Sequence, residues 1–131
     1  MPQQPLDYQP PPRVIGKGGR IGVALACLVA GIVVTPVAMS LAVASGGAGH
    51  GGYEFARLFF PYSMLLTLTT GDTITDPLIA IAWAQFPAYG LVFAGAALRS
   101  MKAFRVAAIG IGASHFIAVI ACFSGAIPNF S

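Results

Sequence analysis

Long uncharged apolar runs alternate with short polar or charged stretches along this chain. Three runs cover residues 21–45, 77–98 and 106–124, and a shorter apolar stretch covers residues 55–70. A helix rises about 1.5 Å per residue, so each of the three runs has about the length that the roughly 30 Å hydrocarbon core of a bilayer requires. The pattern therefore predicts transmembrane helices.

Composition supports a membrane environment. Only 8% of the residues are charged and 56% are hydrophobic, whereas about a quarter of an average soluble domain is charged. The basic residues gather in stretches that flank the apolar runs, where anionic headgroups and insertion topology favour them. The net charge of +3 therefore indicates the lipid bilayer as a partner. Nucleic acid is not expected, because no basic run with interleaved aromatic residues is present.

We expect an all-α integral membrane protein built as a four-helix up-down transmembrane bundle. The helices would cover residues of about 21–45, 54–70, 77–98 and 104–124, within a membrane domain of residues 21–131. Residues 1–20 are rich in Pro, Gly and Gln and predict a disordered tail, because such a stretch buries too little apolar area to offset its ordering entropy. In a bacterium this multi-pass protein would lie in the plasma (inner) membrane.

The second helix, which contains RLFFPYSMLLTLTTG at residues 57–71, either crosses the membrane or re-enters. Residues 55–70 rise only about 24 Å as a helix, which is short for a crossing. Re-entry would let the basic tail and the basic residues 99–105 both face the cytoplasm. The stretch offers few polar side chains to a water boundary, however, so we expect a short helix that essentially spans. Arg57 would then reach outward to the headgroups.

Residues 1–44 also resemble a cleaved signal peptide in one respect, since Ala42-Val43-Ala44 has the A-x-A form of a cleavage site. The apolar run before it is longer than the usual 7–15 residues, and Pro36 interrupts it. We expect a retained membrane anchor, with cleavage as the alternative.

Small residues recur at four-residue spacing in three of the predicted helices, which places each series on one helix face. Burial of apolar area does not drive helix association in lipid, whereas close backbone approach does. The residues expected to pack helices together, within this chain or against another subunit, are Gly22, Ala26, Ala30, Ala84, Ala88, Gly90, Ala108 and Gly112. Pro36, Pro61 and Pro87 predict helix kinks.

Gln85 and His115 are the two strongly polar side chains deep in the apolar runs. Counted from the basic turn between their helices, Gln85 lies about 20 Å away and His115 about 18 Å away. Because the two helices are expected to be antiparallel neighbours, these side chains should hydrogen-bond to each other or through a shared water. Ser114 and Tyr89 are further candidates for this cluster, which we interpret as structural.

No motif indicates catalysis, because HExxH, GxSxG and paired carboxylates within an apolar run are all missing from the sequence. Cys27 and Cys122 lie in apolar runs and are expected to be small buried hydrophobes. They form no Cys/His cluster with metal-ligand spacing. We therefore expect neither an enzyme nor a resident metal or cofactor.

The function that this pattern favours is that of a small membrane protein acting through helix packing, as an accessory subunit or a homo-oligomer. The alternative is a haem-binding or a proton- or solute-translocating component that uses His115 and Gln85, because intramembrane ionisable residues are often functional. A bis-histidine haem needs a second ligand, and the only other histidine, His50, lies in a glycine-rich loop.

Overall fold

The computed structural model describes residues 15–47, 52–125 and 127, and this part of the chain is helical with no strand. Three helices are long and apolar enough to cross a membrane, namely α1 (Lys17–Ser45), α4 (Asp76–Arg99) and α5 (Met101–Phe123). The coarse prediction of an all-helical protein, with helices long and apolar enough to span a membrane, is confirmed for the described residues. Residues 1–14 of the expected tail and His50 lie outside the described residues.

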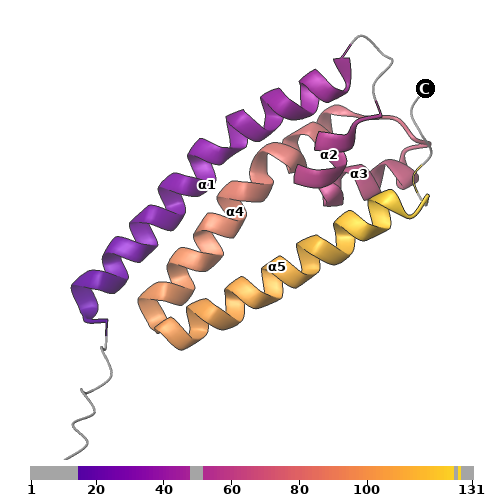
Figure 1. Cartoon of the computed structure of the whole chain (residues 1–131). Coiled ribbons are helices and arrows are strands. Elements are labelled where there is room, and N and C mark those ends of the chain that lie inside the picture. The colour runs from indigo at the N-terminus through magenta and orange to yellow at the C-terminus, as the bar shows by residue number, and fades with distance from the viewer. Residues whose placement is uncertain (1–14, 48–51, 126, 128–131) are drawn as a thin grey trace, which may run out of the picture.

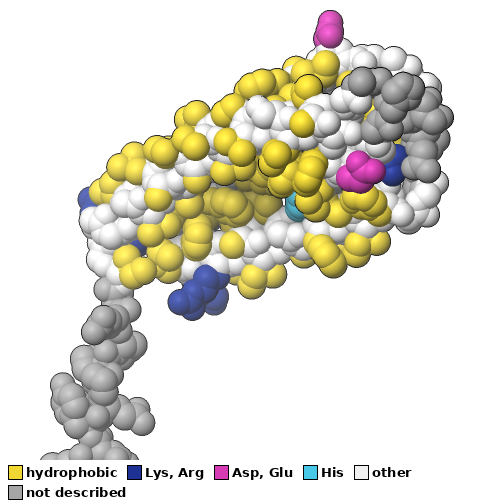
Figure 2. All heavy atoms as spheres, turned by 45° about the horizontal axis from the view of Figure 1, so that its top comes forward, with side chains coloured by type: hydrophobic (Ala, Val, Ile, Leu, Met, Phe, Trp, Pro, Cys, Tyr) yellow, Lys and Arg dark blue, Asp and Glu magenta, His cyan; other side chains and the backbone are white. Residues whose placement is uncertain are grey.

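The three long helices form a wedge. α1 and α4 lie side by side, while α5 diverges from α4 with distance from the turn that joins them (Figure 1). Two six-residue helices, α2 (Glu54–Phe59) and α3 (Pro61–Leu66), fill the wide end of the wedge between α4 and α5. Hydrophobic side chains cover much of the outer surface, and charged side chains lie toward its ends (Figure 2).

α1 begins at Lys17, four residues before the predicted start, so residues 17–20 belong to the helix and not to the tail. Arg20 Nη1 donates a hydrogen bond of 3.2 Å to the carbonyl oxygen of Arg99. This bond places the start of α1 beside the turn between α4 and α5. We call the basic residues gathered there the basic end: Lys17, Arg20, Arg99, Lys102 and Arg105.

A single residue, Ser100, separates α4 from α5. Its hydroxyl oxygen accepts a hydrogen bond of 3.0 Å from the backbone N–H of Ala103, which is the usual contact of a helix N-cap. This cap explains why α5 begins at Met101, before the predicted start at residue 104.

Two glycines allow the backbones of α1 and α4 to touch. A Cβ atom at Gly31 would lie 2.6 Å from the carbonyl oxygen of Phe86, and one at Gly90 would lie 2.7 Å from that of Cys27. Any larger residue would push the helices apart, so this is the close backbone approach that stabilises helix pairs in lipid. The buried residues of α1 lie on the same side and are Ala24, Gly31, Thr35, Ala38 and Ala42.

Of the small residues predicted to pack, Gly90 lies in this interface, Ala108 is half-buried, and the other six are exposed. The exposed six are Gly22, Ala26, Ala30, Ala84, Ala88 and Gly112. A series at strict four-residue steps advances about 40° around a helix at each step. Helices that cross at a small angle instead follow a repeat of 3.5 residues, and the buried series of α1 has that repeat. The interface within the described chain therefore uses another face of α1.

Residues 54–70 do not form one continuous helix. Phe60, between α2 and α3, has φ −125° and ψ 49°, outside the helical region. Pro61 explains the break, because its ring disfavours the helical conformation of the residue before it and it has no N–H to donate. The kink predicted at Pro61 is therefore a complete break. Pro36 and Pro87 lie inside continuous helices.

The broken segment, which we define as residues 54–69, enters and leaves at the same end of the bundle. Beside its start, the ring of Tyr53 lies so close to Gly46, just after α1, that a Cβ there would clash with it. Beyond the break, the hydroxyl of Ser63 donates a 2.7 Å hydrogen bond to the carbonyl oxygen of Leu78, near the start of α4. A short 3-10 turn, η2 (Thr67–Thr69), ends the segment.

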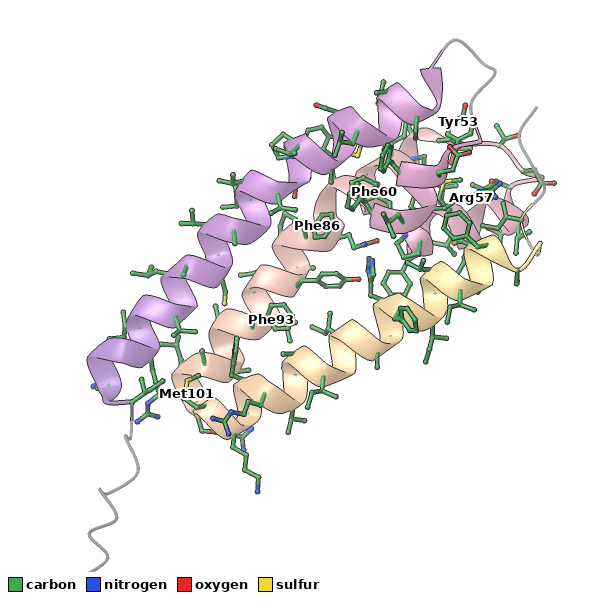
Figure 3. The ribbon with its side chains drawn as sticks, in the orientation of Figure 1. Tyr53, Arg57, Phe60, Phe86, Phe93 and Met101 are labelled. Carbon is green, nitrogen blue, oxygen red and sulfur yellow. The ribbon has the colours of Figure 1, made fainter. Side chains whose placement is uncertain are left out.

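The turning point of the broken segment lies deep in the bundle. Phe60 packs edge-on against Phe86, with ring centroids 5.6 Å apart (Figure 3). Phe86 is ten residues into α4, or about 15 Å from the start of that helix. The turning point therefore lies about 15 Å along α4 from the end of the bundle at which the segment begins and ends.

Candidate functional site

The break in the broken segment exposes backbone carbonyls, and side chains from two other helices bind them. α2 ends where Pro61 supplies no N–H, so the last carbonyls of α2 lack partners in a following turn. Gln85 Nε2, from α4, donates a 2.8 Å hydrogen bond to the carbonyl oxygen of Phe59. His115 Nε2, from α5, lies 3.0 Å from the carbonyl oxygen of Leu58. Consecutive carbonyls are thus held from two sides.

The contacts of His115 determine where its proton sits. A carbonyl oxygen only accepts hydrogen bonds, so Nε2 must carry the hydrogen that it donates to Leu58. Nδ1 lies 3.1 Å from the hydroxyl oxygen of Tyr89. In a neutral ring, Nδ1 therefore accepts the Tyr89 hydroxyl proton, and both ring nitrogens are used in hydrogen bonds within the chain.

Further polar contacts surround this pair. The hydroxyl groups of Tyr62 and Ser114 lie 2.5 Å apart, which links α3 to α5. The Tyr62 ring also packs edge-on against His115, with centroids 6.3 Å apart. Cys122 adds a weak bond from its thiol to the carbonyl oxygen of Pro61, at 3.4 Å. We call the five side chains Tyr62, Gln85, Tyr89, Ser114 and His115 the polar cluster.

One side-chain atom of the polar cluster, Oε1 of Gln85, has no hydrogen-bond partner among the described residues. Gln85 is only 6% exposed, and its Oε1 atom is buried without a hydrogen-bond partner in the described part of the chain. Rotating the Gln85 amide by 180° would not give Oε1 a donor, because Oε1 would then face the Phe59 carbonyl oxygen, which is also an acceptor. A buried acceptor of this kind carries a desolvation penalty, which a donor such as a water molecule would relieve.

The structure brings together all four residues predicted for the polar site: Gln85, Tyr89, Ser114 and His115. The described chain has no hydrogen bond between Gln85 and His115 themselves, because each binds a carbonyl of the broken segment. Backbone carbonyls have no side-chain signature, so sequence reasoning missed them as partners. The only signal in the sequence was Pro61.

Sequence reasoning also missed Arg57 as a buried residue. Its side chain is 6% exposed, and its guanidinium carbon lies 6.0 Å from the centroid of the Phe123 ring. It does not reach outward as expected, because α2 points into the bundle and α5 covers it. Arg57 thereby joins α2 to the end of α5 through a cation–π contact.

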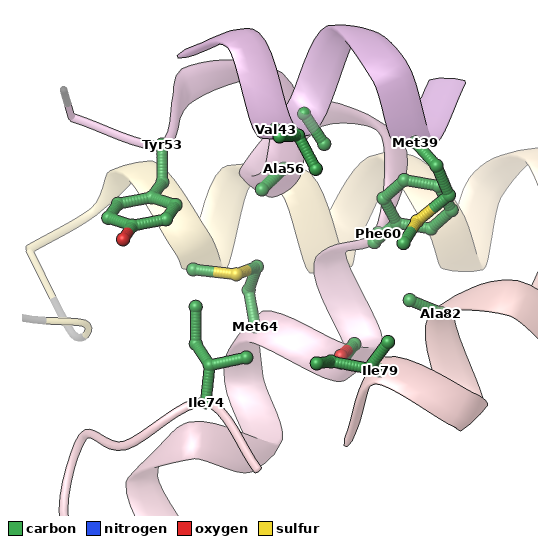
Figure 4. A pocket seen from close by; sticks show the side chains of 11 residues that line it. Met39, Val43, Tyr53, Ala56, Phe60, Met64, Ile74, Ile79 and Ala82 are labelled. Carbon is green, nitrogen blue, oxygen red and sulfur yellow. The ribbon is translucent and has the colours of Figure 1, made fainter. Parts of the chain in front are cut away.

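Two hollows lie beside the broken segment. An open crevice of about 480 Å³ between α4 and α5 is lined by His115, Tyr89 and mostly apolar side chains. A second pocket of about 220 Å³ lies between α1, the broken segment and α4 (Figure 4). Its main polar side chain, Ser63, already donates to Leu78, so this pocket offers a ligand little besides apolar contact.

Comparison with known proteins gives no match to this chain, whether with family models, curated proteins or solved structures. Among the described residues, no group of three or more His, Cys, Asp or Glu side chains could hold a metal ion. The chemistry that the polar cluster itself supports is hydrogen bonding between helices.

Proposed function

We propose that this chain is a small multi-pass membrane protein in which α1, α4 and α5 cross the bilayer and the broken segment re-enters. With three crossings, the start of α1 and the turn between α4 and α5 share one side. The bond from Arg20 to Arg99 supports this arrangement, because it gathers the basic end at one surface. The positive-inside rule then puts the basic end in the cytoplasm.

The polar cluster supports re-entry. Irregular backbone at membrane depth is tolerated only where protein or a water-filled cavity satisfies its polar groups. Gln85 and His115 provide these hydrogen bonds, to the carbonyl oxygens of Phe59 and Leu58 respectively. The polar cluster is then a clamp that holds a re-entrant helix pair in place, and it is the observation on which this proposal depends.

The role that follows is packing, as an accessory subunit or a homo-oligomer, without catalytic activity. The side-chain groups of the polar cluster are largely committed to structure. The outer faces of the helices remain available, since Ala118 and Cys122 are the only buried residues of α5. The glycines and alanines exposed on these faces would allow close approach of another helix.

Labelling of single cysteines tests the topology. Cysteines are placed at Gly47, Thr73 or Ser100, in a chain whose Cys27 and Cys122 are replaced by alanine, and treated with a membrane-impermeant maleimide. Re-entry predicts that positions 47 and 73 react from one side and position 100 from the other. If positions 47 and 73 react from opposite sides, the segment crosses and the proposal is wrong.

Crosslinking in native membranes tests the packing role. A cysteine at Ala113, exposed on α5, should give a crosslinked product whose mass distinguishes a second copy from another subunit. A cysteine at Val92, exposed on α4, serves as the comparison. Absence of a product from all exposed positions of α1 and α5 would contradict association through these faces.

Translocation of a proton or a small solute is the second candidate, and the unpartnered Oε1 of Gln85 is the observation that favours it. Haem binding is less favoured, because both ring nitrogens of His115 are already hydrogen bonded. An absorption spectrum of the purified protein tests haem directly. A Soret band that disappears in His115→Ala would overturn the packing proposal.

A further inference from the structure

The crevice between α4 and α5 is suited to an apolar guest. Its lining includes Phe93, Gly112 and Phe116, with His115 and Tyr89 as the polar members. The imidazole of His115 and the hydroxyl of Tyr89 bind each other, and His115 also binds the broken segment. A hydrocarbon chain in the crevice would therefore leave no imidazole or hydroxyl group without a partner.

The crevice has the depth of one membrane leaflet. Along α5 its lining runs from Ala108 to Val119, which is about 16 Å of helix. Half of a hydrocarbon core of roughly 30 Å is about 15 Å. The crevice thus matches the depth that a single acyl chain occupies.

Positive charge lies about one turn of α5 beyond the lining of the crevice, toward the basic end, and we call this end of the crevice its mouth. Arg105 precedes Ala108 by three residues and Gly112 by seven, so the three lie on one face of α5. Lys102 and Arg105 are both exposed in the first two turns of α5, where the helix dipole disfavours cations. A phosphate group held there would offset that repulsion. Figure 2 shows the hollow with its histidine in cyan and the basic side chains in dark blue over the start of α5.

We propose that this crevice binds an anionic phospholipid, with the phosphate at the basic end and one acyl chain between α4 and α5. The charge at the mouth favours an anionic lipid over a second copy of the chain, whose own basic end carries the same sign. This inference requires only that the chain lies in a bilayer, and it does not depend on the packing role.

Native mass spectrometry of the full chain, released from vesicles with equal amounts of phosphatidylglycerol and phosphatidylcholine, tests the proposal. We expect phosphatidylglycerol adducts to dominate. A basic residue near an anionic surface contributes about a fivefold preference, so Lys102→Gln and Arg105→Gln should each reduce the excess about fivefold. Equal binding of the two lipids by the unaltered chain would overturn the proposal.

Two glycines of α5 locate the site. A Cβ atom at Gly112 or at Gly110 would meet no atom within 4 Å, so the backbone has room for a side chain to begin at either position, but only Gly112 lines the crevice. Gly112→Leu should therefore abolish the phosphatidylglycerol adduct, and Gly110→Leu should retain it. An equal loss in both variants would overturn the assignment. The assignment would also be overturned if the unaltered chain forms a dimer and Gly112→Leu converts it to a monomer without changing the amount of bound lipid. This face would then bind a second copy of the chain and not a lipid.

Discussion

Replacing Gly90 by alanine should separate α1 from α4. The added Cβ would lie 2.7 Å from the carbonyl oxygen of Cys27, whereas ordinary contact begins at 3.4 Å. The helices must therefore move apart by about 0.7 Å at this point, which weakens the dispersion contacts on both sides of it. Overpacking of this kind costs about 1–3 kcal/mol. We expect Gly90→Ala to lower the free energy of unfolding by that amount.

Unfolding in mixed micelles with increasing SDS, followed by loss of helical circular dichroism, measures this effect. Gly95→Ala is the matched control, because Gly95 lies on the same helix and a Cβ there meets nothing within 4 Å. It should be neutral or stabilising by up to about 1 kcal/mol, since alanine favours a helix more than glycine does. If Gly90→Ala unfolds at the same SDS fraction as Gly95→Ala, the proposed backbone contact is absent.

The double variant with Gly31→Ala refines the test. Gly31 lies in the same interface, where its Cβ would approach the carbonyl oxygen of Phe86. Once one substitution has moved the helices apart, the second needs less additional movement. The combined loss should therefore be smaller than the sum of the two single losses, as is usual for residues that share a contact. Strict additivity would argue that the two sites act separately.

Three further outcomes follow from the hydrogen bonds. Gln85→Leu removes the donor to the Phe59 carbonyl and should destabilise the fold by about 0.6–1.7 kcal/mol in the same SDS titration. His115→Phe should speed amide hydrogen exchange in the broken segment while leaving α1 unchanged, since it frees the Leu58 carbonyl; equal exchange in both proteins would contradict the clamp. Ser100→Ala should cost about 1 kcal/mol by removing the cap of α5, and Ser100→Asp should restore most of it.

The three long helices could be predicted because lipid imposes a simple length requirement. The expected ranges 21–45 and 77–98 differ from α1 and α4 by at most four residues at any end. The boundaries that differ most, at Lys17 and Met101, are set by a contact between distant residues and by a serine cap. The spacing of apolar residues along the sequence carries no information about either the contact or the cap.

The broken segment was harder to predict because its shape depends on partners elsewhere in the chain. Pro61 alone permits either a kinked helix or a complete break. The break is stabilised because Gln85 and His115 bind the freed carbonyls. Their similar depth could be estimated from the sequence, whereas the position of a third element between them could not.

The residues that pack the helices together could be predicted only in part, because small residues are common throughout the long helices. Ala and Gly are so frequent in the long helices that several faces carry a series of small residues. The face that packs within the chain includes Gly31, which the four-residue series starting at Gly22 excludes. Only the position of a neighbouring helix distinguishes such faces.

The clamp on the broken segment has a consequence for biogenesis. The carbonyls at residues 58 and 59 emerge from the ribosome before either of the side chains that bind them, and His115 comes 57 residues after Leu58. Until α5 has been made, the Leu58 carbonyl lacks the His115 side chain as its partner, and water must satisfy it in the meantime. Burial of the broken segment is therefore completed only when α5, which is synthesised after it, has packed against it.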